Sequence, residues 1–289
     1  MLWILAAVFS ALFAGITAIL SKCGIKNTNS DVATAMRTSV VLLFSWLIVL
    51  LTGAYRGISL IGARSWIFLI LSGAATGASW LCYFKALSLG RVSKVAAVDK
   101  SSVVLSVLFA IVLFQNERNL WQVKLVCLAL IGAGTFLMAE IKKDEDGQSR
   151  AWLLFAMLSA VFAAAASLLA KTGIEGVDSN LATAIRTLVV FVFAWGIVFV
   201  KREWKCVKEV TKKDLVFLVL SGIATGAIWL CYYYAIQNGQ VSVVVPIDKT
   251  SILLTVIFSA SVLKEKISKK AWLGLALLTA GTVFMAVFT

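Results

Sequence analysis

The chain has 289 residues, of which 61% are hydrophobic and only 14% are charged, a composition far outside the range of soluble globular domains. Its formal net charge of +13 invites comparison with nucleic-acid-binding proteins, but the basic residues stand between long apolar stretches and follow the pattern of membrane topology. The composition therefore indicates a membrane protein and argues against a nucleic-acid partner.

Apolar stretches recur along the whole chain, and each is long enough to cross a hydrocarbon core of roughly 30 Å as a helix. The links between them are short, so no room is left for a soluble domain. The sequence predicts an all-α polytopic membrane protein whose ten transmembrane helices lie at residues 2–21, 33–52, 66–89, 92–114, 120–140, 151–172, 181–200, 214–237, 241–263 and 271–288.

A duplication runs through the chain at an offset of 149 residues. It aligns residues 31–46 with 180–195 and residues 72–101 with 221–250, and in the second alignment 17 of 30 positions are identical. The predicted domains are a first five-helix repeat at 1–141, a linker at 142–150 and a second five-helix repeat at 151–289.

Each repeat contains an odd number of spans, so the second copy must enter the bilayer from the side opposite to the first. The two copies are therefore predicted to be inverted repeats. This arrangement is typical of secondary transporters, in which two similar bundles expose a site alternately to either side of the membrane.

The fourth and ninth predicted spans carry the same ionic pair, within "AVDKSSVV" and "PIDKTSIL". A charge inside a bilayer costs roughly 2.5 to 3.5 kcal/mol on insertion scales, so such residues are functional candidates by default. Asp99 and Asp248 are candidate ion-coupling or substrate-amine sites. Lys100 and Lys249 are candidate counter-charges or carboxylate partners.

The ionic pairs allow two interpretations. In a continuous helix, Ser102 and Ser251 share a face with the aspartates and complete a polar line turned away from lipid. Neighbouring residues point about 100° apart in a helix, so each aspartate is then expected to pair with the lysine of the other repeat. Alternatively, Pro246 starts the ninth helix, because proline favours the first turn, and Asp248 merely complements the helix dipole.

Aromatic residues repeat on the third and eighth spans, where Trp229 and Tyr232 copy Trp80 and Tyr83. Rings with polar tips can line a substrate cavity by offering a ring face and a hydrogen bond, although plain helix packing explains the same pattern. The same two spans contain small-xxx-small pairs that predict a close approach of neighbouring helices, namely Gly73 with Gly77 and Gly222 with Gly226.

Two arginines, Arg37 and Arg186, stand near the start of the second and seventh spans. We expect them to anchor to lipid headgroups, with attraction of an anionic substrate as the alternative.

The chain has no histidine, and its five cysteines match no metal or redox spacing. Without these groups or a nucleophile motif, the sequence indicates no metal, no cofactor and no enzymatic reaction.

The loops of one parity hold 17 basic residues, whereas the loops of the other parity hold five, including Lys124 and Lys171. The positive-inside rule then places both termini outside the cell.

The "ATAxRT" start of the second and seventh spans, the "SGxATGxxWLCY" third and eighth spans, and "NERNLWQ" or "KEKISKKAW" before each last span resemble the EamA branch of the drug/metabolite transporter superfamily. The resemblance covers nearly the whole chain. It implies ten helices in an inverted-repeat arrangement, a central cavity lined largely by spans 1, 3, 4, 6, 8 and 9, and both termini in the cytoplasm, against the charge count.

The "DKSS" and "DKTS" elements are similar to those of half-length, five-span members of this family, here fused in tandem. Many relatives have a proline in the fourth and ninth spans where this chain has Asp-Lys, so their substrates are not carried over.

We predict a secondary active transporter of the plasma membrane that exports a small polar or zwitterionic metabolite, such as an amino acid, driven by a proton or cation gradient. The alternatives are a flippase for a lipid-linked sugar or phosphate, and a non-transporting membrane scaffold. The expected partners are membrane lipid and the substrate, and the expected assembly is a monomer or homodimer.

Overall fold

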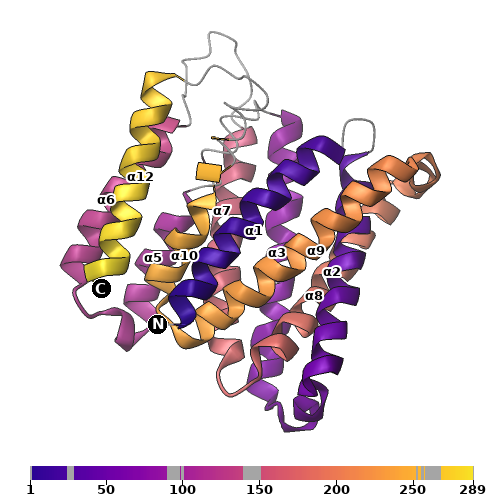
Figure 1. Cartoon of the computed structure of the whole chain (residues 1–289), viewed down its shortest axis with the longest axis horizontal. Helices are drawn as coiled ribbons and strands as arrows, with labels where there is room; N and C mark the ends of the chain where they lie inside the picture. Colours follow the sequence, from indigo (N-terminus) through magenta and orange to yellow (C-terminus); the bar gives the residue numbers. More distant parts are fainter. Residues whose placement is uncertain are drawn as a thin grey trace. The chain divides into compact units, whose positions relative to one another are not determined.

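The computed structural model describes residues 2–24, 29–89, 98, 101–138, 151–251, 253–254, 257 and 268–288. Within these ranges the regular secondary structure is helical, without strands. The elements, of which the α-helices are labelled in Figure 1, are α1 Leu2–Gly24, α2 Ser30–Thr52, η1 Ala54–Leu60, α3 Ala63–Leu89, α5 Ser102–Leu113, η2 Gln115–Glu117, α6 Trp121–Met138, α7 Ala151–Ile174, α8 Ser179–Val200, η3 Glu203–Glu209, α9 Lys212–Asn238, α10 Val241–Lys249 and α12 Lys269–Phe288.

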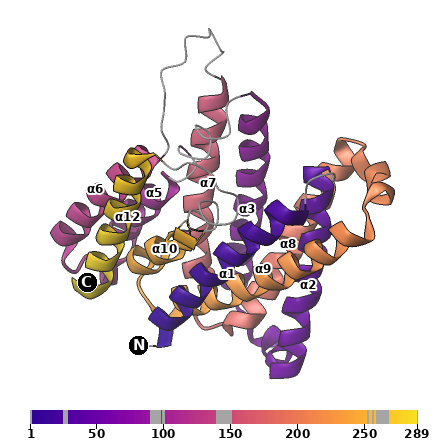
Figure 2. The ribbon, with the colours of Figure 1, turned by 45° about the horizontal axis from the view of Figure 1, so that its top comes forward.

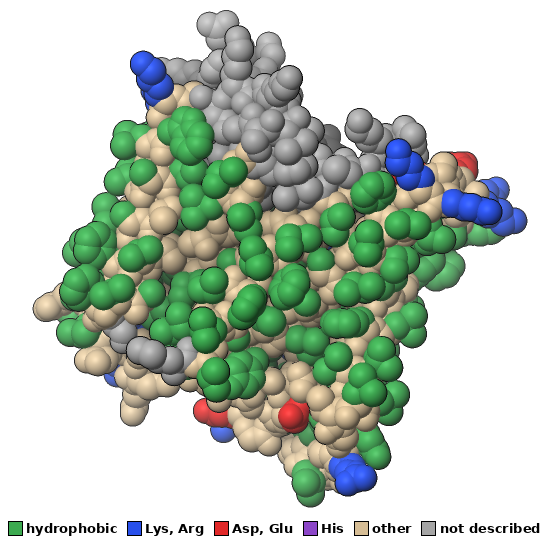
Figure 3. Space-filling view, in the orientation of Figure 1, with side chains coloured by type: hydrophobic (Ala, Val, Ile, Leu, Met, Phe, Trp, Pro, Cys, Tyr) green, Lys and Arg blue, Asp and Glu red, His purple; other side chains and the backbone are tan. Residues whose placement is uncertain are grey.

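Five of the described helices are long and apolar enough to cross a membrane: Asp31–Thr52, Ala63–Tyr83, Ala151–Ile174, Ser179–Val200 and Lys212–Asn238. Four shorter apolar helices accompany them: Leu2–Thr17, Ser102–Leu113, Trp121–Leu137 and Trp272–Phe288. Hydrophobic side chains spread over the face drawn in Figure 3, and the charged side chains in view lie near helix ends. The prediction of an all-α polytopic membrane protein is confirmed.

The duplication is visible in the local structure. The short 3₁₀ helices η1 and η3 lie at the same offset of 149 residues as the sequence repeat. Both second helices start with the same cap, because the side chains of Asn29 and Asp178 accept hydrogen bonds from the second and third backbone N–H groups that follow them.

The chain forms two compact units, Met1–Gly77 with Leu169–Asn238 and Ala78–Leu168 with Gly239–Thr289. Each unit combines helices of both repeats. The predicted linker at 142–150 lies outside the described residues.

In the first unit, the equivalent helices α2 and α8 contact each other and run in opposite directions. Lys201, just past the end of α8, forms an ion pair with Asp31 at the start of α2. Farther along, Trp195 Nε1 donates to Ser39 Oγ at 3.0 Å. Residues later in α2 thus contact residues earlier in α8, so the two helices are antiparallel. The two repeats are therefore inverted, as predicted from the odd number of spans.

The small-xxx-small glycines are contact points between repeats. A side-chain carbon added at Gly73 of α3 would lie 2.7 Å from Val189 of α8, and one at Gly222 of α9 would lie 2.6 Å from Val40 of α2. Gly77 and Gly226 meet Phe193 and Phe44 in the same way. Every contact recurs with both partners shifted by the repeat offset, which is the reciprocity that two-fold symmetry produces. The predicted role of these glycines in close packing is confirmed.

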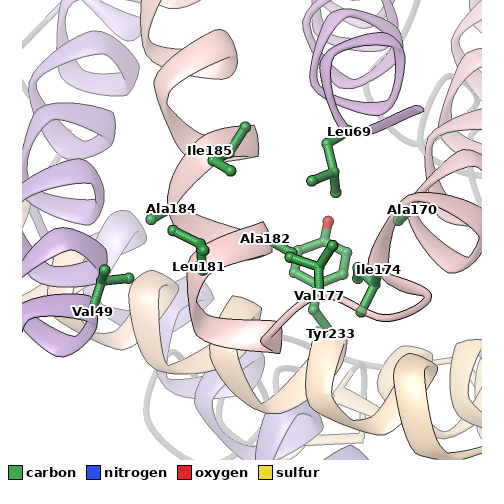
Figure 4. Packing of buried hydrophobic residues seen from close by; sticks show 10 residues of the cluster. All are labelled: Val49, Leu69, Ala170, Ile174, Val177, Leu181, Ala182, Ala184, Ile185 and Tyr233. Atoms are coloured by element: carbon green, nitrogen blue, oxygen red, sulfur yellow. The ribbon is translucent and has the colours of Figure 1, made fainter. Parts of the chain in front are cut away.

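The helix α1 packs along α9 in the first unit, and the two lie side by side in Figures 1 and 2. The buried core of this unit surrounds Tyr233 of α9, whose ring lies among Leu69, Ile174, Val177 and Ala182 in Figure 4. This core joins helices that are far apart in sequence.

In the second unit, the last helices of the two repeats, α6 and α12, also pack antiparallel. A side-chain carbon at Gly134 would lie 2.5 Å from the carbonyl oxygen of Gly274 and 2.6 Å from the amide nitrogen of Leu278. One at Gly281 would reciprocally meet Cys127 and Ile131. The two backbones are therefore in direct contact at these glycines.

The contact between α6 and α12 can be tested with two glycines of one helix. Gly134→Ala is expected to destabilise the protein by about 1 to 3 kcal/mol, because the added methyl group meets backbone atoms that cannot rotate away. Gly132→Ala is the matched control, since its methyl group would meet only Val104 at 3.7 Å. Thermal unfolding in detergent should show a lower midpoint for Gly134→Ala alone; equal midpoints would contradict the close approach.

Candidate functional site

The ninth span is interrupted at its ionic pair. The helix α10 begins at Val241 and ends at Lys249, with Pro246 inside it. Proline supplies no N–H for the preceding turn, so a helix continues poorly across it. The interpretation in which Pro246 starts the helix is therefore wrong, and Asp248 lies in the last turn instead of the first.

Asp248 is buried, with 8% of its surface exposed. Its Oδ2 lies 3.4 Å from Nζ of Lys249, the residue next to it. The helix geometry predicted a poor pairing of neighbouring residues, whereas here the two neighbours form an ion pair at the end of α10. A carboxylate in the last turn faces the negative end of the helix dipole, and this lysine offsets that repulsion.

The equivalent pair of the first repeat, Asp99 and Lys100, lies outside the described residues. The expected pairing of aspartates with lysines of the other repeat is therefore not described. The helix α5 begins at Ser102, two residues after Lys100 in the sequence.

The structure describes part of the predicted polar line. Ser102 and Ser106 are buried on α5, and Ser106 donates to the Ser102 carbonyl oxygen at 2.8 Å. The helix α5 packs against α10 within the second unit. Ser251 lies two residues beyond α10 and is half-buried. Ser102 and Ser106 thus lie inside the protein, as expected for a polar line turned away from lipid.

The four aromatic candidates fall in different units. Trp80 and Tyr83 are half-buried on the part of α3 that belongs to the second unit, where Tyr83 packs against Ala86 and Ala156. Trp229 and Tyr232 belong to the first unit and pack against the core around Tyr233. Packing therefore accounts for part of each aromatic surface.

Arg186 does not reach lipid headgroups, because its side chain is buried in the first unit and only 2% of the residue is exposed. Its Nε donates to Ser72 Oγ at 2.9 Å, and one terminal nitrogen donates to Thr76 Oγ1 at 3.3 Å. The expectation of headgroup anchoring is thus wrong for Arg186. Arg37 is half-buried on α2.

A fully buried ion pair, which the sequence interpretation missed, lies in the second unit. Glu117 and Lys124 are both 0% exposed, with the lysine Nζ 3.2 Å from the carboxylate. The carboxylate also accepts from the backbone N–H of Val241 and from Ser242 Oγ, while Lys124 donates to Gln240 Oε1 at 2.7 Å. Charge counting had assigned Lys124 to a loop.

This cluster positions α10. The carboxylate of Glu117 accepts an N–H group at the helix N-terminus, where a negative charge is also favoured by the helix dipole. All three N–H donors of Lys124 and both carboxylate oxygens of Glu117 have partners within the cluster. We regard it as the structural anchor of the helix that carries Asp248.

Comparison with known proteins identifies the fold and the family. The model of the EamA-like transporter family matches residues 1–139 and 150–287. The "uncharacterized transporter in cobO 3′ region" of Sinorhizobium sp is 41% identical over 140 residues, which are 48% of this chain and 99% of that protein. A crystal structure of a protein with 17% identity superimposes with a TM-score of 0.80 over 98% of this chain and 96% of its own.

The anchor of α10 predicts strong coupling between its two charges. Lys124→Met is expected to destabilise the protein by about 3 to 5 kcal/mol, because it leaves a buried carboxylate without a counter-charge. Adding Glu117→Gln should restore at least half of that loss, since the amide oxygen still accepts from α10 and the negative charge is gone. Thermal unfolding of the single and double variants measures the coupling. Losses that simply add would contradict the ion pair.

Proposed function

We propose a transport mechanism for this chain, which belongs to the EamA-like transporter family and is a membrane transporter. The proposal is a secondary active exporter of a small polar or zwitterionic, amino-acid-like metabolite in the plasma membrane. A proton or cation gradient drives it, and the two inverted repeats expose the substrate site alternately to each side.

The observation that carries the proposal is the buried carboxylate at the end of α10. Asp248 is 8% exposed, and its carboxylate forms an ion pair with Lys249. A carboxylate in a low-dielectric site changes its charge state readily when its partner moves away. Asp248 can therefore exchange the lysine for a proton, a metal cation or the ammonium group of a substrate.

The broken helix favours the same role. Discontinuous helices in transporters place backbone groups and charged side chains at a helix end, where ions and substrates bind. We assign Asp99 the matching role in the first repeat, with Lys100 and Lys249 as counter-charges or carboxylate partners. Ser102 and Ser251 supply hydroxyl groups beside these pairs.

The aromatic residues are the further candidates for substrate contact within each unit. Trp80 and Tyr83 of the second unit, and Trp229 and Tyr232 of the first, offer ring faces to a cationic group and polar tips to a hydrogen-bonding substrate.

Purified protein in liposomes provides the test. With a pH-sensitive dye inside, addition of a transported amino acid should move protons, and radiolabelled substrate should accumulate against its gradient. In Asp248→Asn, we expect uphill accumulation to fall at least about tenfold, because an amide cannot load and release a proton.

The matched control is Asp31→Asn, which alters a second buried aspartate that is paired with a lysine, Lys201. It should leave proton coupling intact. Coupling that survives both Asp99→Asn and Asp248→Asn would rule out the assigned role of these carboxylates.

A further inference from the structure

Among the described residues, the guanidinium group of Arg186 is held by neutral partners. In addition to its bonds to Ser72 and Thr76 of α3, its central carbon lies 3.9 Å from the centre of the Tyr233 ring of α9. These residues all belong to the first unit. Two hydroxyl groups and one aromatic face thus fix both the position and the plane of the group.

The hydrogen bonds of this group are incomplete. A guanidinium carries five N–H donors, and the structure assigns partners to Nε and to one terminal nitrogen. The other terminal nitrogen, Nη1, is buried without a hydrogen-bond partner. No ion pair to Arg186 occurs among the described residues.

A buried charge with neutral partners is costly. An isolated charge inside a protein carries a penalty of several kcal/mol unless a counter-charge and hydrogen bonds offset it. Arg186 satisfies only one edge of its fork, the edge that faces α3. At the other edge, Nη1 and Nη2 each keep one N–H donor in a fixed orientation. Two parallel donors on neighbouring nitrogens are the geometry that binds a planar carboxylate with two hydrogen bonds.

We propose that Arg186 binds the carboxylate group of the transported metabolite. Ser72, Thr76 and Tyr233 act as positioning residues that hold the guanidinium plane. This inference rests on the proposed function and narrows its substrate class to compounds that carry a carboxylate. It also assigns the carboxylate to Arg186 instead of Lys100 or Lys249.

Charge balance favours a carboxylate over a phosphate. Ser72, Thr76 and Tyr233 are neutral, so the site formed by these residues offers the one positive charge of Arg186. Lys171, which also belongs to the first unit, already donates to the carbonyl oxygens of Ile236 at 2.6 Å and Gln237 at 3.2 Å. A phosphate dianion would keep one negative charge uncompensated in a desolvated site, whereas a single carboxylate leaves none.

The site is closed in this conformation. Tyr233 is 6% exposed and belongs to the core of the first unit, with Leu69, Ile174 and Val177 around it (Figure 4). A substrate can reach Nη1 only when this packing loosens. Such an opening is the kind of step that alternating access requires.

Thermal unfolding of the full chain in detergent tests the inference without any gradient. The probes are L-amino acids and their α-amides, which differ in the carboxylate. We expect at least one acid to raise the unfolding midpoint of the wild type and its amide to leave it unchanged, because a bound ligand stabilises the folded state.

Arg186→Gln should abolish the ligand-induced rise. Arg186→Lys, which keeps the charge but lacks the fork, should weaken binding at least about tenfold. The matched control is Arg64→Gln, which removes an exposed arginine from the same helix that carries Ser72. It should keep the full rise. If Arg186→Gln does not give a folded protein, the ligand-induced rise is compared in Arg186→Lys and Thr76→Val instead.

Four outcomes would overturn the proposal. They are no stabilisation by any acid, equal stabilisation by the amide, an undiminished rise in Arg186→Gln, and a rise caused instead by chloride, inorganic phosphate or phosphatidylglycerol. A purely structural arginine would lower the baseline midpoint of Arg186→Gln and leave the ligand-induced rise intact.

The proposed function fails separately. Acid binding through Arg186 without proton flux in liposomes would reject the coupling mechanism and keep this inference. Coupled transport in which amides compete as well as acids would reject this inference and keep the coupling mechanism.

Discussion

The close approach of helices from opposite repeats is the constraint on which the described structure depends. Within a bilayer, apolar side chains gain little by leaving lipid, so helices associate through tight packing. Gly73 of α3 and Gly222 of α9 provide it, because each lets the second helix of the other repeat come within contact distance. One repeat alone leaves this glycine face uncovered. Fusion of two inverted copies in one chain supplies the covering helix and imposes the reciprocal contacts between the second and third helices.

This architecture could be predicted from the sequence, because it follows from the number and spacing of the apolar stretches. Ten apolar stretches, an odd number per copy and an offset of 149 residues over most of each copy determine helices, duplication and inversion without any knowledge of packing. The antiparallel contact of Ser39 with Trp195 confirms the last of these. The glycine pairs were equally readable, since a helix face made of small residues has few uses other than close packing.

The details of the ionic pairs were not readable, because they depend on contacts between distant segments. The start of α10 is set by Glu117, which lies 124 residues before Val241, the residue whose N–H it accepts. A local interpretation of Pro246 had no access to that contact and placed the helix start five residues too late. With the start corrected, Asp248 moves from the first turn to the last. The same limit applies to Arg186, whose position near the start of a span suggested an interface, whereas Ser72 and Thr76 of α3 hold it inside.

Three cations among the described residues differ in how completely their hydrogen-bond donors are satisfied. Lys124 is fully satisfied by a carboxylate, a carbonyl and an amide oxygen. Lys171 donates to the last carbonyls of α9, where a positive charge complements the helix dipole. Arg186 has hydroxyl groups on one edge, an aromatic ring against its face, and a buried nitrogen without a partner. A satisfied charge gains little from a ligand, because any new bond replaces an existing one. A buried donor without a partner instead gains a complete hydrogen bond when a ligand binds, so among these three cations Arg186 has the most to gain from an anion.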